Sequence, residues 1–131
     1  MNESEIARSA KIIAVVGISD KPARSSFEVA DYLSRHAKIL PVNPNLKTWK
    51  TLHCYASLTE VPGDVPIDIV DIFRRSEDVP AVVEDAITHG NVMCIWMQQG
   101  IVNEEAARRA RESGMIVVMD ACLAVVHRLA P

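Results

Sequence analysis

The sequence predicts an α/β protein with a Rossmann-like three-layer fold, in which a five-stranded parallel sheet carries helices on both faces. Short β-branched runs alternate with helical patterns along the whole chain. Runs such as residues 12–16 are apolar without alternation, as expected for strands covered on both sides. With 131 residues, 49% of them apolar, the chain is long enough for one domain with a substantial core, and we expect a single domain over residues 1–131.

The first strand is predicted at residues 12–16, after a short helix over residues 4–10. Gly17 ends this strand abruptly. Ser25, followed three residues later by Glu28, forms a capping box, so the next helix is expected to begin there. A strand, loop and helix in this order place a ligand-binding turn between the two elements.

The loop after the first strand combines the features of an anion site. Free backbone N–H groups and the positive end of the helix dipole converge there, and Lys21 and Arg24 add cationic charge, which favours a phosphate. The loop is neither a Walker A loop nor a Gly-x-Gly-x-x-Gly motif, because Ser19 and Pro22 occupy the second and third glycine positions. The alternative is that Gly17 only permits a tight turn and that the basic side chains are solvated.

The second strand is predicted at residues 38–43, and the residues at its end limit which nucleotide could bind there. Pro41 inside it requires a position where no ladder donor is needed. Where a dinucleotide fold carries a ribose-binding carboxylate, this strand ends in Asn43-Pro44-Asn45. A strand that ends without a carboxylate tolerates a ribose with a 3′-phosphate. Lys47 and Lys50 follow closely enough in the sequence to pair with the negative charge of that phosphate. The alternative is that the Asn-Pro-Asn segment is merely a turn.

Two arginines follow the third predicted strand. Residues 46–66 are expected to form an irregular connection, with a short helix near residues 57–61, and the strand covers residues 67–73. Arg74 and Arg75 come directly after it, at the edge where open α/β sheets bind ligands. Ordinary solvated arginines are the alternative.

The rest of the chain continues the alternation. The expected elements are a helix capped by Ser76 or Asp78 and followed by Gly90, a strand over residues 91–98, a helix from residues 103–105 to Gly114, a strand over residues 115–120 and a short helix over residues 121–129. The loops after the first four strands then share one edge of the sheet, and we expect their candidate residues to meet there.

Composition excludes several function classes. A net charge of −3 without a long basic run argues against a nucleic-acid surface. No apolar run reaches the ~18 residues that span a bilayer, and residues 1–5 lack the basic start of a secretory leader, so we expect a cytoplasmic protein that contacts no membrane. Cys54, Cys94 and Cys122 are odd in number and widely spaced, which predicts neither a disulfide framework nor a metal site.

Five segments together resemble the family of small stand-alone CoA-binding proteins, which look like the nucleotide-binding half of succinyl-CoA synthetase alpha chains. They cover nearly the whole chain in the right order, and they are Ala14-Val15-Val16-Gly17-Ile18-Ser19-Asp20-Lys21-Pro22, Pro41-Val42-Asn43-Pro44, Asp68-Ile69-Val70-Asp71-Ile72-Phe73-Arg74-Arg75, Ile95-Trp96-Met97-Gln98 and Val118-Met119-Asp120-Ala121-Cys122. The chain departs from the family pattern at residues 51–58, so the resemblance does not assign the contacts of the 3′-phosphate.

The resemblance implies a fold that holds coenzyme A as its small-molecule ligand. It places the diphosphate at the first loop, the adenine side near the Val-Asn-Pro turn and the pantetheine past the third and fourth strands. The cofactor-binding residues implied are Gly17, Ile18, Ser19, Lys21, Arg24, Ser25 and Ser26 at the first loop, Val42, Asn43 and Pro44 beside the adenosine, and Phe73, Arg74, Arg75, Met97 and Gln98 along the rest of the ligand.

Two kinds of function remain at this point. The favoured hypothesis is a module that binds CoA or an acyl-CoA without chemistry of its own, because no Ser-His-Asp, Cys-His or paired-carboxylate constellation can be assembled. The alternative is an enzyme, either an NAD(P)-dependent oxidoreductase or a thiol-transfer enzyme using Cys122. That cysteine is expected to start the last helix, where a thiolate is favoured, although a small buried cysteine is the simpler interpretation. Whether the chain forms a homodimer is left open.

Overall fold

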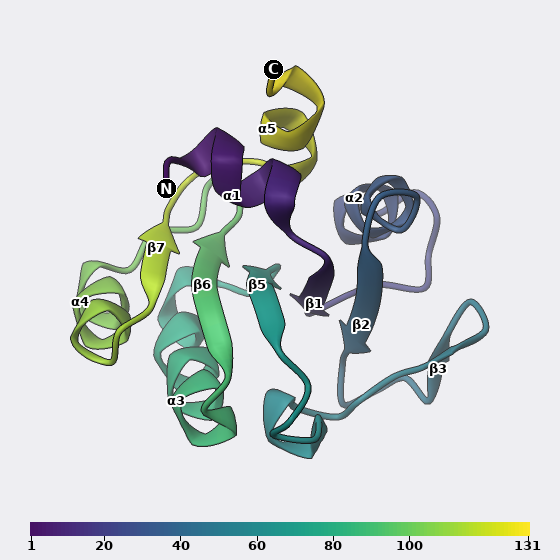
Figure 1. Cartoon of the computed structure of the whole chain (residues 1–131). Coiled ribbons are helices and arrows are strands. Elements are labelled where there is room, and N and C mark those ends of the chain that lie inside the picture. Colours follow the sequence, from purple (N-terminus) through teal and green to yellow (C-terminus); the bar gives the residue numbers. More distant parts are fainter.

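The computed structural model describes residues 1–131 and arranges them in three layers, with the sheet in the middle (Figure 1). This confirms the predicted Rossmann-like α/β fold. The elements in chain order are α1 (Glu3–Ser9), β1 (Ile12–Val16), α2 (Ser25–Leu33), β2 (Lys38–Val42), β3 (Thr48–Trp49), β4 (Leu52–His53), the 3-10 turn η1 (Leu58–Glu60), β5 (Ile67–Ile72), the 3-10 turn η2 (Ser76–Asp78), α3 (Val79–His89), β6 (Val92–Met97), α4 (Glu104–Glu112), β7 (Ile116–Val118) and α5 (Leu123–Leu129).

The five long strands pair in parallel in the order β2-β1-β5-β6-β7. The chain therefore moves outward from β1 to β2 and then crosses back to place β5 on the other side of β1. In open α/β sheets, ligands bind outside the carboxyl ends of the strands at the point where the order reverses. The topology thus indicates that a ligand site would lie at the loops after β1 and β5. The last paired residues of these two strands are Val16 and Ile72.

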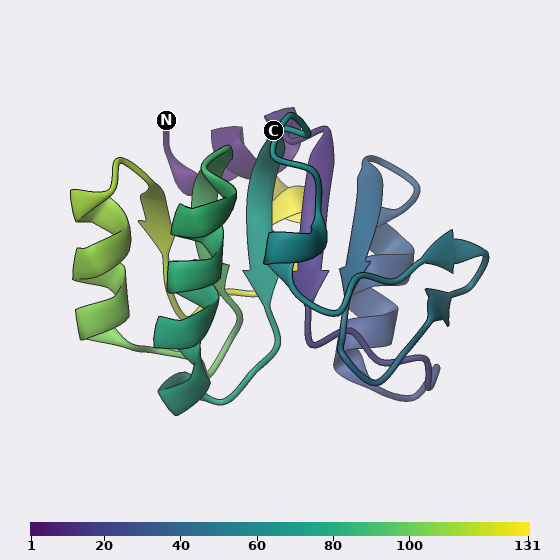
Figure 2. The same ribbon diagram turned by 90° about the horizontal axis from the view of Figure 1, so that it is seen from below.

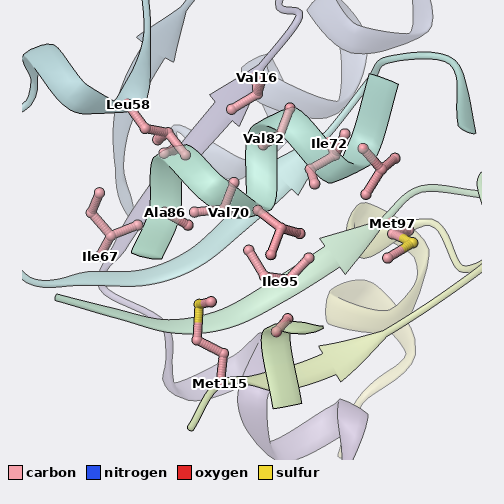
Figure 3. Close-up of a cluster of buried hydrophobic side chains, with 14 of the residues drawn as sticks. Val16, Leu58, Ile67, Val70, Ile72, Val82, Ala86, Ile95, Met97 and Met115 are labelled. Carbon is pink, nitrogen blue, oxygen red and sulfur yellow. The ribbon is translucent and has the colours of Figure 1, made fainter. Parts of the chain in front are cut away.

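Helices cover both faces of the sheet. Figure 2 shows α3 and α4 on one side and α1, α2 and α5 on the other. The face under α3 is close-packed: Val70 and Ile72 of β5 and Ile95 of β6 lie against Val82 and Ala86 of α3 (Figure 3). A sheet buried on both faces explains why its strands read as continuous apolar runs in the sequence.

Pro41 occupies the position that its missing N–H requires. It lies in β2, which is one of the two edge strands of the sheet, and its carbonyl accepts a hydrogen bond from Tyr55 N–H at 2.9 Å. The prediction of a place without a ladder donor is confirmed.

The capping box predicted at Ser25 is wrong. Helix α2 begins at Ser25 itself, Arg24 stands at the N-cap, and no side chain caps the first turn. The neighbouring Ser26 hydroxyl instead accepts a hydrogen bond from Ser19 N–H at 3.0 Å. The Ser26 side chain therefore ties the loop to the helix rather than capping the helix itself.

Other boundaries differ from expectation. Residues 46–66 contain a small antiparallel hairpin, β3 paired with β4, where an irregular connection was expected. Helix α2 ends at Leu33, β7 is shorter than the predicted residues 115–120, and α5 begins at Leu123 rather than at the predicted residue 121. Asp78 stands at the N-cap of α3 without a side-chain cap bond, because its carboxylate is engaged by arginines, and the Ser76 hydroxyl accepts from Val102 N–H.

Candidate functional site

Gly17 brings the first loop directly onto the end of β5. Its φ is +86°, and a Cβ at this position would collide with the carbonyl oxygen of Phe73. Backbone hydrogen bonds join the same strand ends: Gly17 N–H donates to Val42 O at 2.9 Å, and Phe73 N–H donates to Val16 O at 2.8 Å. Only glycine fits here, so the close approach of β1, β2 and β5 depends on it.

The loop after Gly17 is held in shape by side chains from other elements. Asn43 Nδ2 donates to Ile18 O at 2.8 Å, and Trp49 Nε1 donates to Ser19 O at 2.9 Å. Ser26 accepts from the N–H of Ser19. The loop is thus preformed before any ligand arrives, and the hairpin that sequence reasoning missed supplies one of its supports.

Backbone donors are free at the start of α2. The N–H groups of Ser25 and Ser26 have no hydrogen-bond acceptor within the protein. They belong to the first turn of a nine-residue helix, whose dipole is positive at this end. An anionic group at this position would accept hydrogen bonds from both N–H groups.

A cleft of about 700 Å³ opens at the switch point. It contains nine of the residues predicted from the sequence, which are Gly17, Ser19, Arg24, Ser25, Ser26, Phe73, Arg74, Arg75 and Gln98. The other lining residues are Val29, Asp78, Gln99, Ile101 and Cys122. The loops after β1, β5 and β6 and the segment before α5 therefore meet at one edge of the sheet, as expected.

A smaller hollow of about 160 Å³ adjoins this cleft. Gly17 and Arg74 line both, and Val42 and Pro44 line only the smaller one. The residues that sequence reasoning assigned to the adenosine therefore lie beside the main cleft, on the β2 side of it.

Four predicted residues do not line either space with their side chains. Ile18 and Met97 are fully buried at 0% exposure, since they fill the core beneath the loop and the strand end. Asn43 supports the loop, as described above. Lys21 is exposed and lies outside both cavities. Any ligand contact of Ile18 or Met97 would have to come from their backbone.

Three arginines of the cleft differ in their partners. Arg24 is exposed and forms no ion pair or side-chain hydrogen bond. Arg75 Nε donates to Asp78 Oδ2 at 3.0 Å, and Arg74 lies 3.6 Å from the same oxygen. The hydrogen bond from Arg75 lowers the pKa of the Asp78 carboxyl and raises the pKa of Arg75. Asp78 thus restrains two arginines, and the cleft keeps a cationic excess.

The lysines expected near a 3′-phosphate are placed differently. Lys50, in the turn between β3 and β4, pairs with Asp31 of α2 and lies over the rings of Phe27 and Trp49. Since its ammonium is already engaged, it is not free to meet a phosphate in the cleft. Neither Lys47 nor Lys50 lines the two cavities.

At the β6 end, the cleft is lined by Gln98 and Cys122. Gln98 is only 6% exposed, and its Oε1 accepts from Leu123 N–H at 3.0 Å. Cys122 is half-buried at the N-cap of α5, whereas Cys54 and Cys94 are buried in the core. The expected position of Cys122 at the start of the last helix is confirmed, and the residue lines the cleft.

Sequence reasoning missed part of the lining. Gln99 directly follows Gln98, and Asp78 follows the arginine pair at a spacing of three to four residues, so both carried a signal that charge and position could have revealed. Val29 and Ile101 carried none. No helix is long and apolar enough to cross a membrane, and no group of three or more His, Cys, Asp or Glu side chains could hold a metal ion.

Comparison with known proteins adds a family and several relatives. The model of a family described as "CoA binding domain" matches residues 11–128. The uncharacterized protein YneT of Bacillus subtilis is 43% identical over 124 residues, which cover 94% of this chain and 90% of YneT. The acetate–CoA ligase (ADP-forming) II of Archaeoglobus fulgidus is 28% identical over 97 residues, and the match covers 72% of this chain but 14% of the ligase.

Solved structures agree with the fold. A hypothetical protein from Pyrococcus horikoshii superposes with a TM-score of 0.90 at 32% identity, covering 99% of this chain and 92% of that one. The dinucleotide-forming acetyl-coenzyme A synthetase 1 of Ca. Korarchaeum cryptofilum gives a TM-score of 0.77 at 25% identity, with 94% of this chain and 31% of that one covered. The chain thus corresponds to a small stand-alone protein in one case and to part of a larger enzyme in the other.

Proposed function

The chain belongs to the CoA-binding domain family, and from that premise we propose that it binds coenzyme A or an acyl-CoA in the cleft, without catalysing a reaction of its own. The observation that carries the proposal is the cationic cleft of about 700 Å³ at the switch point of the sheet. A volume of this size lies within the range of small-molecule sites. Coenzyme A matches its character, since it combines phosphate groups with a long, mostly neutral arm.

The free donors suggest where the diphosphate lies. The N–H groups of Ser25 and Ser26 have no partner, and the unpaired guanidinium of Arg24 is next to them in the chain. Charge-assisted hydrogen bonds from such groups to phosphate oxygens are short and strong. Arg74 and Arg75 supply further charge from the end of β5.

The adjoining cavities suggest the course of the rest of the ligand. The adenosine would occupy the smaller hollow beside Val42 and Pro44, and the pantetheine would run past Phe73 toward Gln98. This course follows the strand order from β2 to β6 along one edge of the sheet.

The end of β2 favours coenzyme A over NAD. A dinucleotide fold binds the adenosine ribose through a carboxylate near this position, whereas here Asn43 stands there with its amide nitrogen engaged by Ile18 O. The ionisable side chains of the cleft are arginines, the ion-paired Asp78 and Cys122, a set suited to holding an anion rather than to acid–base catalysis.

Calorimetric titration of the purified protein with CoA, dephospho-CoA and NAD tests the proposal. We expect CoA to bind with a Kd of about 1 μM or tighter, equivalent to about −8 kcal/mol, and NAD to bind at least about tenfold more weakly. Dephospho-CoA measures what the 3′-phosphate contributes when Lys50 is engaged elsewhere. Binding of NAD at least as tight as that of CoA would overturn the assignment.

A further inference from the structure

We propose that Cys122 undergoes thiol–disulfide exchange with the disulfide form of a thiol ligand seated in the cleft, so that the protein captures a CoA-type thiol as a mixed disulfide. This inference rests on the proposed function, because it requires that the thiol arm of the ligand lie at the β6 end of the cleft. It adds a covalent, redox-dependent activity to the reversible binding proposed above.

The first observation is the selective exposure of one thiol. Cys122 lines the cleft, and its sulfur makes no hydrogen bond within the protein. Cys94 is 0% exposed and Cys54 is 4% exposed, and both thiols already donate to backbone carbonyls. Burial raises the pKa of both thiols, that of Cys94 to about 12. A disulfide brought into the cleft therefore meets Cys122 and neither of the other two.

The second, independent observation is an unused donor beside that thiol. The Oε1 of Gln98 is identified by the Leu123 N–H that it accepts, so the other end of the amide is the NH₂ group. This nitrogen donates to no group of the protein, although the side chain is only 6% exposed and lines the cleft. The nitrogen opens onto the cleft, where an amide carbonyl of a pantetheine-like arm would supply the acceptor that this donor lacks within the protein.

The thiol and the amide are held in a common frame. Leu123, which binds the Gln98 amide, directly follows Cys122 in the chain. Trp96 Nε1 donates to Ala121 O at 2.9 Å, and Ala121 N–H donates to Met97 O at 3.3 Å. These bonds fasten the segment before α5 to the end of β6, so a carbonyl on Gln98 would place the following part of the arm next to the sulfur of Cys122.

The span of the cleft suits a ligand with an anionic end and a thiol end. The loop that leads to the free donors of α2 follows β1, whereas Gln98 follows β6, and β1 and β6 are two strands apart in the sheet. At the usual strand spacing this separation is about 10 Å. An extended molecule can therefore meet the arginines with its phosphates and Cys122 with its sulfur.

The reaction conserves atoms and electrons without an external oxidant. The thiolate of Cys122 attacks one sulfur of the ligand disulfide, a new S–S bond forms between Cys122 and that half of the ligand, and the original S–S bond breaks. The other half leaves as a thiolate and takes up a proton, equivalent to the one that Cys122 released. Attack by a free thiol on the mixed disulfide reverses the step.

Intact mass spectrometry of the full chain after timed exposure to oxidised CoA tests the proposal, with hydroxyethyl disulfide and glutathione disulfide as probes that lack the nucleotide. We expect one CoA adduct per chain, located on Cys122 by peptide mapping. It should form at least about tenfold faster than the adducts of the other probes, after correction for their rates with free cysteine, because a bound disulfide reacts at a high effective concentration. Reduced CoA should slow the labelling, and dithiothreitol should remove the adduct.

Matched variants separate the thiols and the amide. Cys122→Ser should abolish the adduct, whereas Cys54→Ala and Cys94→Ala should keep it. Gln98→Glu retains an oxygen for Leu123 N–H but removes the NH₂ donor, so it should lower the preference for oxidised CoA over hydroxyethyl disulfide; Gln98→Met removes the polar group without adding charge and should do the same. Circular dichroism melting identifies any variant that fails to fold.

The outcomes distinguish this inference from the proposed function. If calorimetry shows that reduced CoA binds while oxidised CoA labels Cys122 no faster than hydroxyethyl disulfide does, the exchange reaction is refuted and the binding function stands. Equal labelling of all three cysteines, or labelling that needs denaturant, refutes it as well. If reduced CoA does not bind at all, the proposed function fails and the exchange reaction fails with it.

Discussion

Two buried polar side chains come from neighbouring strands of this sheet, one from β5 and one from the residue that follows β6, and they differ in what can reach them. Gln98, at the carboxyl end of β6, uses its oxygen within the fold and leaves its nitrogen at the cleft. Asp71, the next-to-last residue of the central strand β5, is 0% exposed, and neither of its carboxylate oxygens has a hydrogen-bond partner. Its register partners are the apolar Val15 and Trp96.

The difference shows how position in the sheet decides the meaning of an unsatisfied polar group. At the edge, a ligand could supply the missing acceptor, and this is the role in recognition that we propose for the donor of Gln98. Asp71 is enclosed by the protein on all sides, and this burial raises the pKa of its carboxyl well above the ordinary value. The carboxyl is therefore driven toward its neutral form, and its cost falls on stability rather than on binding.

The largest loss of stability is expected at Gly17, where the cleft at the carboxyl edge of the sheet meets the packed core. Replacing it by alanine combines an unfavourable positive φ with a collision against the Phe73 carbonyl. We expect Gly17→Ala to lower the free energy of unfolding by about 3 kcal/mol and to disrupt the cleft as well. Chemical denaturation and CoA titration of the same preparation measure both effects.

Gly100→Ala is the matched control for this variant. Its φ of +85° is almost the same, but a Cβ there would meet no atom within 4 Å. The backbone strain alone should cost about 1–2 kcal/mol. Equal losses in the two variants would show that the contact with Phe73 contributes nothing.

Asp71→Asn probes the buried carboxyl group of the central strand β5. Because the pKa of Asp71 is raised in the folded state, the folded protein keeps a proton that the unfolded chain releases above its ordinary pKa of 3.8. The stability of the wild type should therefore fall as the pH rises above about 4, by up to about 1.4 kcal/mol per pH unit, until the folded-state pKa is passed. The asparagine variant lacks this dependence and should be the more stable protein at pH 7.

Denaturation curves between pH 4 and pH 8 measure this effect. Asp64→Asn is the control, since it changes the same charge on an exposed loop residue. If Asp71→Asn leaves the slope of stability against pH unchanged relative to the wild type, the buried carboxyl is not titrating as its burial implies.

The smallest effect on stability is expected at the edge itself. Arg24 is exposed and has no partner within the protein, so Arg24→Ala should leave the Tm nearly unchanged. CoA binding should weaken by about 1–3 kcal/mol, the range for a lost charge-assisted hydrogen bond. Arg111→Ala, at another exposed arginine outside the cleft, should change neither quantity. A loss of Tm with unchanged affinity would assign Arg24 a structural role instead.

Much of the edge could be predicted from the sequence. The unbroken apolar run at residues 12–16 and the arginines directly after residue 73 place a strand and a charge where parallel strands end, and the structure brings them to one cleft. The exact ends of the helices and strands were less predictable, because they depend on which of several hydrogen-bond partners a side chain or backbone group takes in the folded protein. Ser25 and Glu28 match a capping box, yet the helix begins at Ser25 with Arg24 at the N-cap. The hydroxyl of the neighbouring Ser26 bonds to the loop instead. The hairpin at residues 48–53 is too short for any periodicity to reveal it.

The sequence by itself determined the alternation of strands and helices, and with it the edge where the candidate residues gather, because apolar periodicity and helix signals are local properties of the chain. Only the tertiary structure decided what each polar residue of β5 does. Asp68 accepts hydrogen bonds from the N–H groups of Lys11 and Ile12, whereas Asp71, three residues later, is buried without a partner. The two aspartates stand in similar apolar surroundings in the sequence, and their difference arises from the neighbouring strands and helices that pack around them.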